Sequence, residues 1–174
     1  MRMVLLLVLA LAAIVDRVEI AVGNRVITQS DIELRIRLTA FQNREPVDLS
    51  LANRKAMAQR LIDQRLIERE MEVGHYPRVP AARVDEMMGR FVKDYPSHEA
   101  MEAELAKYGL TAAQLREDFA RQADLLTFID LRFRSGDTAD QKAADERADK
   151  ELDAWLEDQR RRTRIDYTDT ELAK

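Results

Sequence analysis

The chain has 174 residues, of which 46% are hydrophobic and 34% charged, so it can form one folded domain with a buried core. Five glycines and four prolines are too few for a sandwich or barrel that turns about every ten residues. The formal net charge of −4 argues against a nucleic-acid-binding protein, and the absence of cysteine excludes disulfides, thiolate zinc sites and thiol catalysis.

An apolar run from Val4 to Val15 follows the basic start of the chain. It is shorter than the roughly 20 residues of a membrane-spanning helix. A basic residue, a short apolar segment and the small residues of Ala10-Leu11-Ala12 are typical of a secretory signal peptide. We therefore expect residues 1–13 to be a signal peptide and the mature chain to begin near Asp16, outside the cytoplasm. A buried N-terminal element of a cytosolic domain is the alternative.

The first structural elements are predicted to be a β-hairpin and a helix. Apolar residues alternate over 18–22, Gly23-Asn24 suits a two-residue turn, and residues 25–28 form the returning strand. Ser30 and Glu33 have capping-box spacing, which predicts a helix from Asp31 to about Gln42.

The rest of the chain is predicted to be mostly helical. Apolar residues at helical spacing predict helices over 50–73, 80–95, 97–108 and 111–133. Gly74 is expected to end the first of these in a left-handed conformation, and Thr111 with Gln114 forms a capping box. Residues 135–150 are polar and predict a linker. Residues 151–170 predict a last helix followed by a strand.

No motif of a known catalytic or metal site occurs in the sequence. It contains no Gly-rich phosphate loop, no GxSxG and no HExxH. His75 and His98 are expected at the surface, and the carboxylates lie beside Arg and Lys at spacings typical of solvated helix faces. We predict no catalytic residue, no metal and no cofactor. An enzyme built on carboxylates that no motif marks is the alternative.

The one concentrated basic run is Arg160 to Arg164. It could contact the phosphates of a nucleic acid or of anionic lipids. The spacing favours a simpler interpretation, in which Glu157 and Asp158 pair with Arg161 and Arg162 one helical turn later.

Methionines and aromatic residues recur on the predicted helices. Flexible thioethers can adapt to many apolar partners, so these residues are candidates for a peptide-binding groove, although they could also simply fill the core. The candidate groove residues are Met57, Leu61, Met87, Met88, Phe91 and Phe128.

Four motifs occur in a recognisable order. A hairpin ending in VIT-x-SD spans 19–32, an LI-D-x-x-LI helix segment spans 60–67, a GLT-x-x-x-LR helix entry lies within 108–119, and a closing segment spans 155–167. In this order they resemble the SurA N-terminal domain family of periplasmic chaperones. Members of that family carry parvulin prolyl-isomerase modules between the long helix and the closing helix. Here residues 135–150 occupy that place, far fewer than a domain of about 100 residues.

The resemblance implies a chaperone core over 16–134, completed by 151–170, without isomerase activity. It also implies that the two chain ends meet. The expected fold is mainly α: an orthogonal multi-helix core with a small N-terminal β-hairpin joined by a C-terminal strand. The expected function is that of an ATP-independent periplasmic holdase for unfolded polypeptides such as outer-membrane protein precursors, with no nucleic-acid partner and no membrane span in the mature chain. A non-enzymatic helical adaptor that docks one specific envelope protein is the alternative.

Overall fold

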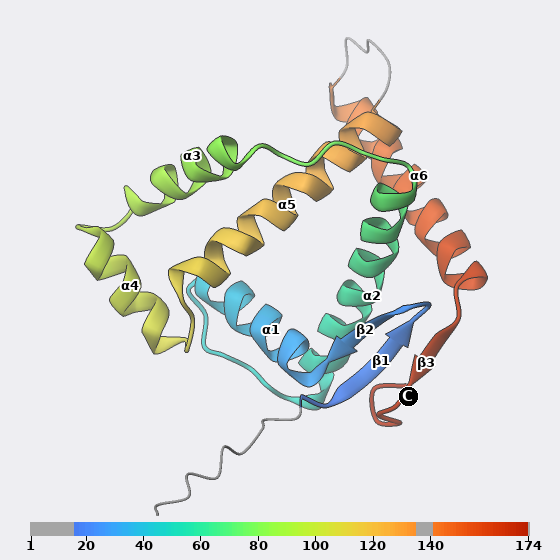
Figure 1. Ribbon diagram of the computed structural model, residues 1–174, viewed down its shortest axis with the longest axis horizontal. Helices are drawn as coiled ribbons and strands as arrows, with labels where there is room; N and C mark the ends of the chain where they lie inside the picture. Colours follow the sequence, from blue (N-terminus) through green and yellow to red (C-terminus); the bar gives the residue numbers. More distant parts are fainter. Residues whose placement is uncertain (1–15, 135–140, 174) are drawn as a thin grey trace, which may run out of the picture.

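The computed structural model describes residues 16–134 and 141–173, so the expected signal peptide lies outside the described residues. The described part of the chain contains six helices and a small three-stranded sheet (Figure 1), which confirms the predicted mainly α fold. The elements in chain order are β1 (Val18–Val22), β2 (Arg25–Thr28), α1 (Gln29–Asn43), α2 (Leu51–Val73), α3 (Ala81–Val92), α4 (His98–Lys107), α5 (Ala112–Phe133), α6 (Gln141–Arg162) and β3 (Ile165–Tyr167).

The sheet joins the two ends of the described chain, as predicted. All its strands are antiparallel, in the order β2-β1-β3, and Val22 of the central strand pairs with Ile165 of the last. Gly23 has a φ of 61° in the hairpin turn, and its N–H donates to the carbonyl of Arg164 at 2.9 Å. Glycine suits this position because a side chain there would be strained.

The predicted N-terminal cap of α1 is wrong by two residues. Thr28 is the N-cap: its hydroxyl accepts from the N–H of Asp31 at 3.2 Å, and the Asp31 carboxylate accepts from the N–H of Thr28 at 3.1 Å. Thr28 still has the extended backbone of β2, so the strand passes directly into the helix. Ser30 instead donates its hydroxyl to Asp16.

Two further local predictions are corrected. Gly74 ends α2 with a φ of −83°, and the neighbouring His75 adopts the left-handed conformation instead, with a φ of 52°. The predicted linker over 135–150 is helical from Gln141 onward. The reason is that Ala144 and Ala148 are buried, which gives this polar segment a narrow contact seam of small residues.

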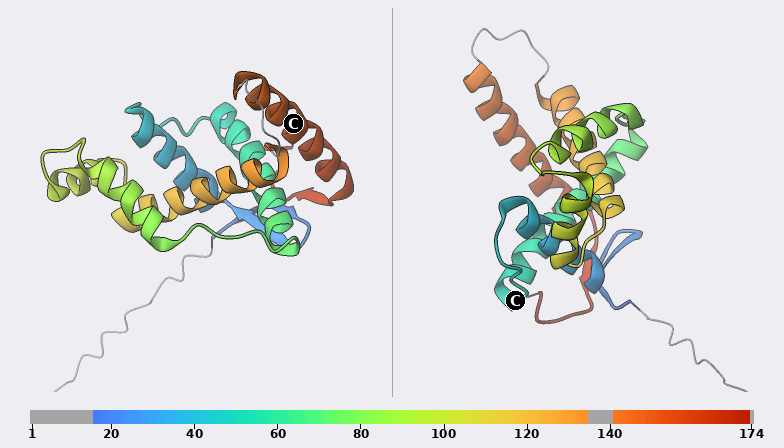
Figure 2. Two further views of the ribbon diagram at one scale, coloured as in Figure 1. Left: turned by 90° about the horizontal axis from the view of Figure 1, so that it is seen from above. Right: turned by 90° about the vertical axis from the view of Figure 1, so that its left-hand side faces the viewer.

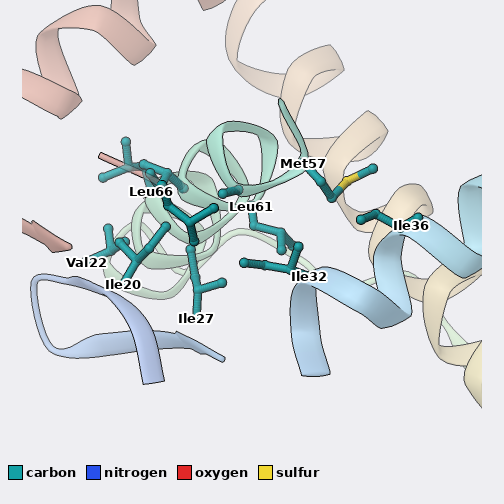
Figure 3. Close-up of a cluster of buried hydrophobic side chains, with 11 residues drawn as sticks. Ile20, Val22, Ile27, Ile32, Ile36, Met57, Leu61 and Leu66 are labelled. Atoms are coloured by element: carbon teal, nitrogen blue, oxygen red, sulfur yellow. The ribbon is translucent and has the colours of Figure 1, made fainter. Parts of the chain in front are cut away.

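Three buried clusters form the core, and α1, α2 and α5 each take part in two of them. The sheet cluster joins the sheet to α1 and α2 (Figure 3): Ile20, Val22, Ile27, Ile32, Ile36, Met57, Ala58, Leu61, Ile62, Leu66 and Leu172. The arm cluster joins the end of α1 to α3, α4 and the start of α5: Leu38, Phe41, Val84, Met101, Leu105, Leu110, Leu115 and Phe119. The α6 cluster joins α2, α5 and α6: Ile67, Met71, Phe128, Phe133, Ala148 and Leu156.

Helices α1, α2 and α5 therefore frame a triangle, with one buried cluster at each corner. Figure 1 shows α1, α2 and α5 as its sides, with α6 beside α2. Helices α3 and α4 form an arm that projects to one side of this frame (Figure 2). Because the helices pack mainly at the corners, the middle of the triangle is the place where a cavity can open.

A buried carboxylate lies where β1 meets β3 and the segment that follows it. Glu19 of β1 has no exposed side-chain surface, and neither of its carboxylate oxygens accepts a hydrogen bond within the described residues. Arg54 Nη2 lies 3.5 Å and Arg17 Nε 3.8 Å from its Oε1. Burial raises the pKa of Glu19, Arg17 and Arg54 oppose this rise, and the nearby charge of Asp169 adds to it.

We expect Glu19→Gln to flatten the dependence of stability on pH. Because the folded-state pKa is raised, the contribution of Glu19 to stability is fully present below its unfolded value and is lost as the pH rises through the folded value. The Gln variant should therefore be at least as stable as the wild type at neutral pH. Thermal unfolding between about pH 4 and pH 8 tests this, with the exposed Glu45→Gln as control. A destabilised Gln variant with an unchanged pH slope would contradict it.

Candidate binding cavity

A cavity of about 390 Å³ opens in the middle of the helical triangle. Residues of α1, α2, α5 and α6 form its walls, so segments far apart in the sequence meet there. The lining residues are Arg35, Thr39, Gln42, Met57, Arg60, Leu61, Asp63, Gln64, Ile67, Arg121, Gln122, Leu125, Ile129, Leu152 and Leu156.

One wall of the cavity is apolar. Helices α2, α5 and α6 each contribute a pair of apolar residues four positions apart, which places both on one helix face. The pairs are Met57 and Leu61, Leu125 and Ile129, and Leu152 and Leu156. Leu125, Ile129 and Leu152 are only half-buried. Apolar surface is therefore available to a ligand in the cavity.

The buried carboxylate of Asp118 organises the polar wall. Asp118 of α5 is fully buried, pairs with Arg35 of α1, and accepts from Gln42 Nε2 at 2.9 Å. Gln122 Nε2, one turn further along α5, donates to it at 2.7 Å. Arg35 in turn donates to Gln64 Oε1 of α2 at 3.0 Å. One network thus joins all three sides of the triangle.

An ion pair between Asp63 and Arg160 ties α2 to α6 at the edge of the cavity. The guanidinium is bidentate, with Nε 2.8 Å from Oδ1 and Nη2 2.5 Å from Oδ2. Burial raises the pKa of Asp63, and Arg160 opposes that rise. The pair fixes α6 in the position where Leu152 and Leu156 complete the apolar wall.

The predicted groove residues do not come together in one place. Met57 and Leu61 are buried in the sheet cluster and line the cavity. Met87, Met88 and Phe91 lie half-buried against the arm cluster. Figure 1 places their helix α3 away from α2 and α6.

Phe128 has no exposed surface and packs in the α6 cluster. Its ring centroid lies 5.0 Å from that of Tyr76 and 5.6 Å from that of Trp155. A core role accounts for these contacts. The cavity is lined on this side by its neighbours Leu125 and Ile129, whereas Leu131 on the same helix is 53% exposed.

Sequence reasoning did not select the apolar residues of α5 and α6 that line the cavity. Leu125 and Ile129 lie on the helix predicted over 111–133, and the apolar spacing of that helix was the available signal. Leu152 and Leu156 lie on the last helix predicted within 151–170. Nothing in either pattern indicates that two such faces meet across a cavity.

The basic run at the end of α6 is internally paired, as predicted. Arg162 Nε lies 2.8 Å from Asp158 Oδ2, and Arg161 lies within 4.0 Å of Glu157. Arg164 Nε lies 2.7 Å from Asp166 Oδ2. These charges are accounted for by pairing within the chain.

His75 and His98 are exposed, and His98 Nε2 lies 3.4 Å from Glu102 Oε1. Over residues 16–134 and 141–173, no group of three or more His, Asp or Glu side chains is arranged to hold a metal ion. Within the same part of the chain, no helix combines the length and apolar character needed to cross a bilayer.

No protein-family model matches the chain, and a search of curated proteins finds no match. Membership of the SurA N-terminal domain family therefore stays a prediction from the sequence motifs.

We expect Asp118→Ala to destabilise the fold by about 3–5 kcal/mol, because it leaves the partly buried charge of Arg35 without its partner. Asp130→Ala on the same helix is the matched control. Its carboxylate is exposed and, among the described residues, pairs only with Arg134, so the expected loss is below about 1 kcal/mol. Urea unfolding measures both free energies. Equal losses would show that the Asp118 network does not hold the frame.

Proposed function

We propose that the protein is an ATP-independent holdase that binds unfolded, extended polypeptides in the central cavity. The observation that carries this proposal is the half-buried apolar surface of Leu125, Ile129 and Leu152 in a cavity of about 390 Å³. That volume lies within the range of about 300–1,000 Å³ of small-ligand sites, so the cavity suits a short stretch of apolar side chains.

The cavity favours weak and reversible binding. Burial of apolar surface contributes about 25 cal/mol per Å². Much of that gain is offset by the cost of ordering a flexible chain. Exchangeable binding of this kind lets a chaperone release its client without nucleotide hydrolysis.

The proposed location and clients rest on the sequence. The expected signal peptide supports action in the periplasm, and the motif resemblance supports outer-membrane protein precursors as clients. Neither is needed for the cavity to bind an extended peptide. The two claims can therefore be tested separately from the binding itself.

We expect the folded protein to suppress the aggregation of a urea-unfolded outer-membrane β-barrel protein diluted into buffer. Apolar segments of the client would be shielded in the cavity instead of associating with one another. Light scattering at near-equimolar ratio measures this, with an equal amount of an inert protein as control. Unchanged aggregation in the presence of the folded protein would contradict the proposal and favour an adaptor for one envelope protein.

Substitutions at two adjacent leucines on α5 test whether the central cavity is the binding site. Leu125 lines the cavity, whereas Leu126 is 54% exposed and does not. We expect Leu125→Gln to weaken client binding about fivefold or more, a loss of about 1 kcal/mol, and Leu126→Gln to leave it unchanged. Fluorescence titration with a labelled client measures both affinities, and thermal unfolding confirms that both variants fold.

A substitution on the arm tests the alternative location of the binding surface. If Met88→Ala weakens client binding and Leu125→Gln does not, the binding surface lies on the arm cluster, and the central cavity is not the site. Met88 is half-buried, so its truncation should leave the fold intact.

A further inference from the structure

A second depression borders the central cavity at the connection between α1 and α2. This outer depression has a volume of about 210 Å³ and shares Thr39, Met57 and Arg60 with the central cavity. Its remaining lining residues are Ile36, Ala40, Glu45, Pro46, Asp48 and Asn53. The two hollows adjoin at these shared residues and together are called the path below; it is apolar in the middle of the triangle and more polar beyond Arg60.

Three of the four charged side chains that line the central cavity are already paired. Arg35 pairs with Asp118, and Asp63 pairs with Arg160. Arg121 Nη1 lies 2.7 Å from Glu117 Oε1.

Arg60 is the exception. Its side chain is exposed at the boundary of the two hollows, and it has no ion pair or side-chain hydrogen bond with any residue the structure describes. The exposed Asp153 also acts on Asp63, but it does not line either hollow.

The charge changes sign on the outer side of Arg60. Glu45 and Asp48 line the outer depression, and both are exposed. An anionic group at the boundary would meet the Arg60 guanidinium. The same group placed further along the path would face two carboxylates.

We infer that the path binds an extended polypeptide whose apolar side chains occupy the central cavity and whose next residue carries a carboxylate paired with Arg60. This inference rests on the proposed function and names its substrate class, an apolar segment followed directly by an acidic residue. Guanidinium groups pair with carboxylates through two parallel hydrogen bonds, which supplies the preference for this one position.

Short fluorescent peptides with one common apolar block test the inference. The residue after the block is Glu, Gln or Lys, and a fourth peptide carries its Glu four residues further along. Fluorescence anisotropy with the folded protein measures each dissociation constant. We expect the adjacent-Glu peptide to bind about five- to tenfold more tightly than the Gln peptide, and the Lys and displaced-Glu peptides to bind no better than the Gln peptide.

Substitution of Arg60 distinguishes a specific ion pair between Arg60 and the peptide carboxylate from a general attraction of acidic peptides to the protein. Arg60→Gln should abolish the preference for the adjacent Glu, and Arg60→Glu should reverse it in favour of the Lys peptide. Arg90→Gln is the matched control, because Arg90 of α3 is also exposed, lines neither hollow and has no ion pair within the described residues. It should leave the preference unchanged.

The outcomes distinguish the inference from the proposed function. Equal affinity for all four peptides overturns the acidic preference and leaves the holdase proposal standing. Equal loss of the preference in the Arg60 and Arg90 variants also overturns it, because the attraction would then be unspecific. If none of the peptides binds, both the inference and the proposed function fail.

The direction of the bound peptide can be tested by cysteine labelling. The sequence contains no cysteine, so a single introduced thiol is the only one in the protein. Glu45→Cys places one thiol at the outer depression, and Arg90→Cys places one on the arm. A peptide with a bromoacetyl group beyond its acidic residue should alkylate the first variant faster than the second. The same group at the apolar end should give no such difference. Equal labelling of both variants, whichever end carries the bromoacetyl group, would contradict the inference that the acidic end of the peptide lies toward the outer depression.

Discussion

The structure depends on how the buried carboxylate of Asp118 is satisfied. Three helices pack at their corners, and beside the corner where α1 meets α5 this side chain pairs with Arg35 and accepts a hydrogen bond from Gln42. A buried charge is costly unless ion pairs and hydrogen bonds surround it. The fully satisfied network therefore admits few other arrangements of the helices. It joins α1, α2 and α5 beside the central cavity, and four of its members, Arg35, Gln42, Gln64 and Gln122, line that cavity.

The chain ends complete this frame. Strand β3 pairs with β1, and the preceding helix α6 is thereby directed along α2, where Arg160 meets Asp63. Leu152 and Leu156 supply one apolar wall of the cavity from this helix. The cavity thus requires that β3 fold back onto β1. The sheet is small, but by pairing β3 with β1 it positions the preceding helix α6, which forms one wall of the cavity.

Local elements could be predicted from the sequence because their signals are local. The hairpin at Gly23 and the capping box at Thr111 depend on a few neighbouring residues, and both are present. The cap at Thr28 was missed because Ser30, two residues later, also has a hydroxyl that can cap a helix. Only the course of β2, which ends at Thr28 with an extended backbone, selects Thr28 as the N-cap. The start of α6 was missed because its polar composition conceals the two buried alanines, Ala144 and Ala148, of which Ala148 packs in the α6 cluster.

The candidate site was less accessible to such reasoning. Met57 and Met87 have the same local pattern, yet one lines the cavity and the other packs against the arm cluster. Only the tertiary arrangement distinguishes them.

That arrangement also divides the charges of the cavity into two kinds. Arg35, Arg121 and Asp63 are committed to pairs within the chain, so changes there act on stability and binding together. Arg60 is exposed and unpaired within the described residues, so a substitution there removes little from the folded state. Stability and ligand preference are therefore separable at this position. An effect of Arg60 on binding can be assigned to contact with the ligand rather than to a change in the frame.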